Sequence, residues 1–140
     1  METAQNKVQA DRYGIRIDGE YKVLLCSSLF YFRIPRSRWQ ERIDALLRSG
    51  YNAADVYFPW NFHEREEGRF DFSGERDVRA FLKMCAESGL YVIARFGPYI
   101  CSEWTGGALP ARVVHRSEKI RTSDPYFLAE TMRWYGQILP

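Results

Sequence analysis

Three short apolar runs alternate with segments of helical period, and this alternation limits the possible folds more than any other feature. The runs lie at the end of 21–26, over most of 52–58 and over 90–95. Apolar residues recur instead at helical spacing over 36–49, 75–88 and 124–139. Buried strands that alternate with amphipathic helices form parallel βαβ units with right-handed crossovers. We therefore predict an α/β fold.

Turn residues divide the chain further. Asp18-Gly19 stands between two runs of strand-forming residues, 13–17 and 21–26, and predicts a β-hairpin. Residues 1–12 are polar with weak ordering signals, so we interpret them as a lead-in to one domain over 13–140. Since the end of the 21–26 run and the 90–95 run are almost wholly apolar, we expect strands buried on both faces.

Two architectures fit this pattern, a doubly wound open sheet and a (β/α)₈ barrel. The glycine-rich phosphate signatures GxGxxG and GxxxxGK[ST] do not occur, which counts against a dinucleotide-binding sheet. A complete barrel takes typically about 250 residues. A chain of 140 residues would supply roughly its first three or four units, and Pro140 directly follows the last predicted helix. On this interpretation the chain is interrupted.

Charge and cysteine content exclude several classes of function. The net charge of +2 comes from 20 basic and 18 acidic residues that are interspersed, so we predict no nucleic-acid partner. No apolar run reaches the roughly 18 residues of a membrane span, and 1–12 lacks the apolar stretch of a signal sequence. Three cysteines without CxxC spacing predict neither a disulfide framework nor a zinc site. We expect a cytoplasmic protein without metal or membrane contact.

Aromatic and polar residues gather where each predicted strand ends. The three strand ends are followed by 27–33, 57–64 and 96–104. Ligands bind at the carboxyl ends of parallel strands, and sugars present apolar ring faces together with hydroxyls. This concentration indicates a carbohydrate site. A core rich in rings explains the aromatic content of 16% equally well.

The charged residues at these ends have structural explanations too. Glu103 could pair with a cation such as Arg95. His63-Glu64 resembles half of a metal or acid–base pair, but without partners it is more typical of structural hydrogen bonding. Cys101 as a nucleophile has no evident base.

Four motifs in the right order carry a family resemblance. GPYICSEW over 97–104, followed by Gly107 and Leu109-Pro110, resembles GPYICAEW…GGLP, and YFPWNFHE over 57–64 resembles YVPWNxHE. YFRIPR over 31–36 and GRFDFSG over 68–74 add support. From about Tyr13 to Leu139 the chain resembles glycoside hydrolase family 35, whose best-known members are β-galactosidases acting from the non-reducing end.

The resemblance implies a (β/α)₈ TIM barrel of which this chain is the truncated N-terminal portion. It also implies a retaining mechanism that needs no cofactor or metal and acts on a β-galactoside. Both catalytic glutamates of the family come from later strands, the acid from an Asn-Glu pair, and no Asn-Glu occurs here. We therefore assign no catalytic residue to this chain. The alternative is a non-catalytic carbohydrate-binding or degenerate homologue.

Substrate contacts are what the resemblance carries over. Tyr57 and Glu103 resemble residues that hydrogen-bond galactose hydroxyls, and the backbone around Ile100, Cys101 and Ser102 resembles the wall beside the same sugar.

The chain also departs from the family's motifs at five positions. The family has His, Pro, Ala, Gly and Trp where this chain has Phe30, Phe96, Ser102, Ala108 and Arg112.

Overall fold

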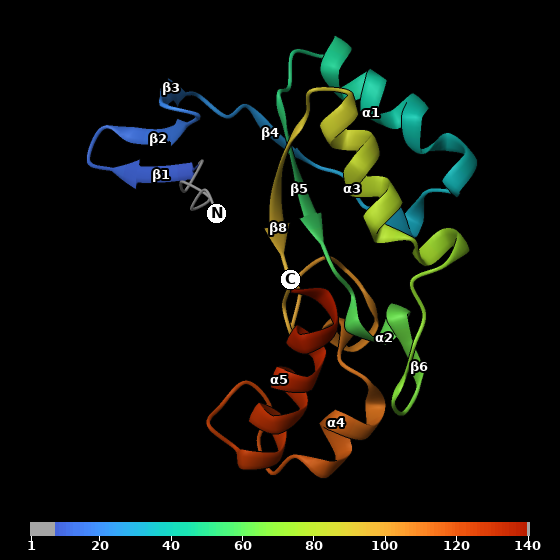
Figure 1. Ribbon diagram of the computed structural model, residues 1–140. Helices are drawn as coiled ribbons and strands as arrows, with labels where there is room; N and C mark the ends of the chain where they lie inside the picture. Colours follow the sequence, from blue (N-terminus) through green and yellow to red (C-terminus); the bar gives the residue numbers. More distant parts are fainter. Residues whose placement is uncertain (1–7, 140) are drawn as a thin grey trace, which may run out of the picture.

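The computed structural model describes residues 8–139, which form three small β-sheets and several helices (Figure 1). The strands are β1 (Val8–Asp11), β2 (Gly14–Ile17), β3 (Glu20–Lys22), β4 (Cys26–Ser28), β5 (Ala53–Tyr57), β6 (Glu64–Glu66), β7 (Arg69–Phe70) and β8 (Tyr91–Arg95). The α-helices are α1 (Trp39–Arg48), α2 (Trp60–His63), α3 (Val78–Glu87), α4 (Ala111–Arg116) and α5 (Pro125–Ile138). Single 3-10 turns are η1 (Tyr31–Arg33), η2 (Arg36–Arg38), η3 (Gly74–Arg76) and η4 (Thr105–Ala108).

The central sheet is parallel and confirms the predicted βαβ units. Its strand order is β4-β5-β8, so the strands of this sheet lie side by side in the order in which they occur in the chain. Figure 1 shows α1 and α3 on one side of this sheet, with no described helix on the other side. α4 and α5 lie beyond the ends of β5 and β8.

The three predicted helices are confirmed, and two of them begin with a side-chain cap. The first begins as η2 and continues as α1, where Trp39 and Ile43 are buried. α3 is capped by Asp77, whose carboxylate accepts from the amide of Ala80 at 2.9 Å. α5 is capped in the same way by Asp124, with Pro125 in its first turn.

A single apolar core fills the space between the sheet and these helices. It includes Tyr31 from η1, Trp39 from α1, Val56 from β5 and Phe81 from α3, all fully buried. Several rings meet edge to face, as Trp39 does with Phe81 at 5.4 Å between centroids. The aromatic content therefore serves the core first, and only some of the rings remain for a ligand.

The N-terminal segment is more ordered than the sequence indicated. The predicted hairpin is confirmed as β2 and β3 around Asp18-Gly19, where both residues have positive φ, at 49° and 85°. Within the predicted lead-in of residues 1–12, however, Val8–Asp11 forms β1, while 1–7 lie outside the described residues. The Asp11 carboxylate closes the turn between β1 and β2 by accepting from the amides of Tyr13 and Gly14.

The prediction of a single buried strand over 21–26 is wrong. β3 ends at Lys22, and the chain turns before β4 starts a different sheet at Cys26. The side chain of Asn52 fixes the segment between β3 and β4, because it accepts from the amide of Leu25 at 2.8 Å and donates to the carbonyl of Val23 at 2.9 Å. Val23 is 78% exposed and contributes nothing to the core.

The strand over 90–95 is confirmed as β8, but its predicted burial on both faces is wrong. Val92 packs against the core, whereas Ile93 is 41% exposed. The cause is the uncovered side of the sheet, since no element of the described residues packs there. Three further elements were not predicted: the helix α4, and the short strands β6 and β7, which flank a turn at Gly68 where the sequence does indicate a small turn. In residues 8–139 no helix is both long and apolar enough to span a membrane.

Candidate functional site

A cavity of about 480 Å³ opens beside the carboxyl ends of β5 and β8. Its volume falls within the range of roughly 300–1,000 Å³ that is typical of small-molecule sites. The lining residues are Tyr57, Arg95, Phe96, Gly97, Pro98, Tyr99, Ile100, Cys101, Arg121 and Phe127. The sequence predicted this end of the sheet, and the structure brings Tyr57, Ile100 and Cys101 together there.

Tyr57 ends β5 and is held between two neighbours. The guanidinium of Arg95 lies over its ring at 4.4 Å from the centroid, and Arg95 in turn donates to Asp55 at 3.1 Å. Phe30, which replaces the histidine of the family motif, packs against the same ring with centroids 5.6 Å apart. Only 8% of Tyr57 is exposed, so the ring forms part of a rigid cavity wall.

The loop that forms the opposite wall is folded back on itself. The amide of Ile100 donates to the carbonyl of Gly107 at 2.9 Å. A Cβ on Gly107 would lie 2.1 Å from the ring of Tyr99, so only glycine allows this approach. Ala108, which replaces the second glycine of the family motif, takes a φ of 68°. The family's glycine pair thus corresponds to two consecutive left-handed residues.

Ser102 and Glu103 follow in the same loop but do not line the cavity. Ser102 is 1% exposed, and its hydroxyl has no hydrogen-bond partner in residues 8–139. Glu103 is exposed and has a φ of 50°, in the left-handed region that residues with a Cβ rarely adopt. The structural alternative of a Glu103–Arg95 pair is wrong, because Arg95 pairs with Asp55.

His63 confirms the structural interpretation of the His63-Glu64 pair. The ring is fully buried, with Nδ1 3.0 Å from the carbonyl of Asp71 and Nε2 bonded to the hydroxyl of Tyr31. A carbonyl can only accept, so Nδ1 carries the proton and Nε2 accepts from Tyr31. Burial lowers the pKa of His63 to about 4 and raises the pKa of the Tyr31 hydroxyl. The imidazole is therefore neutral at pH 7.

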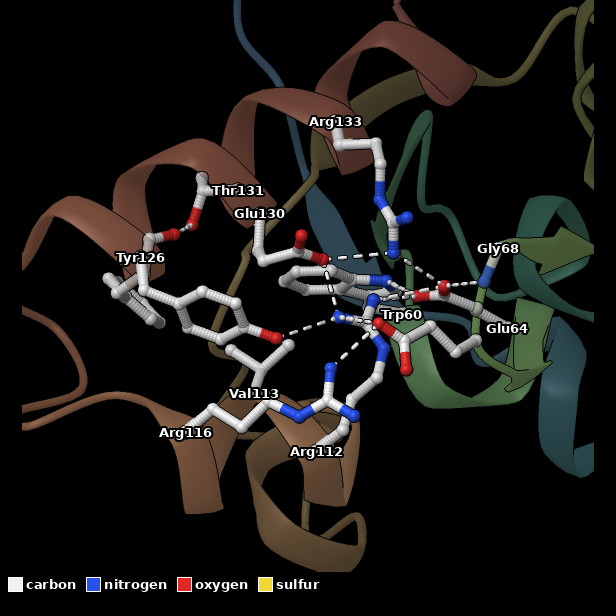
Figure 2. A network of polar contacts seen from close by, with 12 residues as sticks. Trp60, Glu64, Gly68, Arg112, Val113, Arg116, Tyr126, Glu130, Thr131 and Arg133 are labelled. Carbon is white, nitrogen blue, oxygen red and sulfur yellow. Dashed lines mark hydrogen bonds and ion pairs between the residues drawn. The ribbon is translucent and has the colours of Figure 1, made fainter.

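Glu64 lies at the centre of the polar network in Figure 2. Its carboxylate is 1% exposed and accepts from Trp60 Nε1 at 2.6 Å, the Gly68 amide at 2.6 Å, Arg112 at 2.9 Å and Arg133 at 3.0 Å. Arg112, which replaces the family's tryptophan, also pairs with Glu130 of α5. This network fastens the β6–β7 hairpin to α4 and α5, and Glu64 has no acceptor capacity left for a ligand.

The remaining chemical alternatives find little support. Cys101 is exposed at the cavity, but no histidine lines it and His63 is engaged elsewhere. Across residues 8–139, no three His, Cys, Asp or Glu side chains are arranged to hold a metal ion.

Arg121 is a cavity residue that the sequence did not indicate. It lies in the segment between α4 and α5, and its guanidinium stacks over the Tyr99 ring at 4.4 Å from the centroid. Its φ of 61° turns the chain there. No signal in the sequence marks a positive φ at an arginine, so this contact could not have been found in advance.

Comparisons with known proteins agree with the motifs. The profile of Glycosyl hydrolases family 35 matches residues 14–140. β-Galactosidase of Felis catus is 47% identical over 124 residues, which is 88% of this chain and 18% of the relative. β-Galactosidase of Mus musculus is 44% identical over 124 residues, covering 88% of this chain and 19% of the relative. The chain therefore spans about a fifth of the length of these relatives.

A solved structure supports the fold. The crystal structure of β-galactosidase from the psychrophilic Marinomonas ef1 matches with a TM-score of 0.55 at 22% identity, over 67% of this chain and 13% of that chain. The identity is too low to indicate more than a shared fold. The profile match and the identities above 40% establish descent, and the chain belongs to glycosyl hydrolase family 35.

Proposed function

We propose that this chain supplies one wall of the galactose-binding site of a retaining exo-β-galactosidase-type hydrolase. In this proposal β4, β5 and β8 are the first strands of a (β/α)₈ barrel, and the uncovered side of the sheet faces the barrel interior. Asp55, Tyr57 and Arg95 then point inward, since residues two apart on a strand share a face.

One observation supports the proposal above all. Tyr57 from β5 and Ile100 with Cys101 from the loop after β8 lie more than 40 residues apart in the chain and line one cavity. That cavity is at the carboxyl ends of the strands, where barrel enzymes bind their substrates.

The groups around this cavity suit a sugar. Glu103 does not line the cavity itself but lies in the loop of its wall, two residues after Cys101, and makes no salt bridge or side-chain hydrogen bond within residues 8–139, so its carboxylate can accept from two sugar hydroxyls. The hydroxyl of Tyr57 adds a further donor or acceptor. Arg95 and Tyr57 form a flat surface against which a sugar ring can lie, and the turn of the loop presents backbone groups beside it.

The bond-breaking step is assigned to glutamates outside these 140 residues. One glutamic acid protonates the leaving glycosidic oxygen while a second carboxylate attacks the anomeric carbon and forms a glycosyl-enzyme. Water then attacks that carbon, the first residue takes the water's proton, and the sugar is released with its configuration retained. Neither role falls to Glu103 or Glu64.

The proposal is tested with two proteins, the 140-residue chain and the product of the complete reading frame that contains it. We expect the longer product to hydrolyse a chromogenic β-galactoside and the 140-residue chain to show no turnover. Turnover by the short chain that disappears in Glu103→Gln would refute the assignment of the chemistry to other residues. Galactose binding without hydrolysis by either protein would favour a binding module.

Glu103→Gln tests the binding role in the complete protein. The substitution keeps the volume and removes the charge, and a bond to a charged group corresponds to roughly 10- to 150-fold in kcat/KM. Tyr57→Phe removes only a hydroxyl, and we expect a loss of about tenfold or less. If both variants keep wild-type kinetics, the cavity does not hold the substrate.

A further inference from the structure

The backbone at Glu103 is held in an uncommon conformation by side chains from distant segments. Its φ of 50° lies in the left-handed region, which few residues other than glycine adopt. Such conformations persist where the surrounding structure imposes them, and they concentrate at functional sites. The question is which contacts impose this one.

Arg33, at the end of η1, makes the first of these contacts. Its Nη2 donates to the carbonyl of Ser102 at 2.8 Å and to the carbonyl of Glu103 at 2.5 Å. These two carbonyls belong to the peptide planes on either side of the Glu103 Cα. Fixing both planes fixes φ and ψ of Glu103, and with them the direction in which its side chain leaves the backbone.

Asn61, in α2, makes the second contact, just downstream. Its Nδ2 donates to the carbonyl of Thr105 at 3.0 Å, and its Oδ1 accepts from Trp104 Nε1 at 2.7 Å. The Trp104 ring packs edge-on against Phe32 of η1, with centroids 4.9 Å apart. A primary amide is the side chain that offers both a donor and an acceptor at this distance.

We propose that Arg33 and Asn61 are positioning residues for Glu103. Resting on the proposed function, this inference assigns them the task of holding the Glu103 carboxylate where a galactose hydroxyl pair can reach it. They touch no substrate themselves. Arg33 lies in the segment after β4, and Asn61 lies in the segment after β5. These two segments together orient Glu103, which lies in the segment after β8.

Arg33→Lys is the sharpest test, because a lysine keeps the charge but its shorter side chain does not place a donor where Nη2 lies between the two carbonyls. Arg36→Lys is the matched control: Arg36 also donates to a backbone carbonyl, that of Gly74 at 2.8 Å, but away from the loop. In the complete protein we expect Arg33→Lys to weaken galactose binding roughly 10-fold or more, with the melting temperature close to that of Arg36→Lys. Amide hydrogen exchange should quicken at Gly107 and Leu109, whose amides donate to carbonyls of this loop, and not in α3.

A double-mutant cycle separates positioning from simple stabilisation. If Arg33 acts through Glu103, Arg33→Lys should cost little further affinity in a Glu103→Gln background. Fully additive losses, or wild-type affinity in Arg33→Lys, would overturn the positioning role while leaving the galactose site intact. A wild-type protein that does not bind galactose would instead refute the proposed function, and with it this inference.

Discussion

The segments that follow β5 and β8 both carry a glutamate beside aromatic rings, yet the two carboxylates have opposite surroundings. Glu64 is 1% exposed and accepts hydrogen bonds from a tryptophan, a backbone amide and two arginines. Glu103 is exposed, and within the described residues its carboxylate has no protein partner, although its backbone is held firmly. The contrast teaches that a strand-end carboxylate indicates a ligand site only when its acceptor capacity remains free.

The largest expected effect of the comparison concerns stability. Glu64→Gln removes the charge shared by Arg112 and Arg133, and breaking a buried ion pair costs about 3–5 kcal/mol in the free energy of unfolding. Glu103→Gln is the matched control, because it makes the same chemical change at an exposed site. Urea denaturation of both variants measures the difference. Equal midpoints would mean that the two carboxylates are not distinct in role.

The pH dependence of stability gives a second test of the structural role of the segment after β5, through His63. Burial lowers its pKa from 6.5 to about 4, so between these values the unfolded chain binds a proton that the folded chain does not. Stability is therefore complete above pH 6.5 and falls by roughly 3 kcal/mol as the pH drops to 4. The pKa values of the carboxyls of Asp71 and Asp77 are lowered from 3.8, so their contributions are lost only below this window.

His63→Gln is the control for this window. Glutamine can still donate to the Asp71 carbonyl and accept from Tyr31, but it does not titrate. Melting temperatures between pH 4 and 7 should therefore vary less in the variant than in the wild type. An unchanged pH dependence would assign the effect to other groups.

The smallest expected effect lies in the loop after β8. Ala108 has a φ of 68°, and a left-handed conformation costs a residue with a Cβ about 1–2 kcal/mol, part of which glycine loses again in chain entropy. Ala108→Gly should therefore stabilise the protein by up to about 1 kcal/mol. Ala86→Gly, at an exposed position in the last turn of α3, should destabilise it by up to about the same amount. A destabilised Ala108→Gly would show that the buried methyl group outweighs the strain.

Local chemistry explains why much of the fold was predictable. The Asp18-Gly19 turn and the helical periodicity that became α1, α3 and α5 are each encoded within a few residues, and both were confirmed. Burial of the strands was not predictable, because it depends on what packs against the sheet. Ile93 is apolar in sequence and exposed in the structure for this reason, whereas Val23 is exposed because it lies between β3 and β4, in no strand.

The candidate site was likewise predictable only in part. Tyr57, Ile100 and Cys101, which the motif matches singled out, line one cavity, since strand ends in a parallel sheet converge. Arg121 reaches the cavity through a positive φ, and Arg33 reaches Ser102 across 69 residues of sequence. Neither contact follows from periodicity or spacing. The role of Glu103 and its neighbours in sugar binding stays a prediction.

The strand order of the parallel sheet has a consequence for synthesis on the ribosome. Because β5 pairs with β4 and β8 pairs with β5, every pairing is made with a strand that has already left the exit tunnel. A sheet in which a late strand inserts between two earlier strands cannot form its final pairings until that strand has been synthesised. This sheet can instead grow by adding each new strand at one edge. The connections closed in this way, 29–52 and 58–90, are long, but the entropic cost of closing a loop rises by only about 0.6 kcal/mol for each doubling of its length. The nascent chain can thus acquire its architecture in the order in which it is translated.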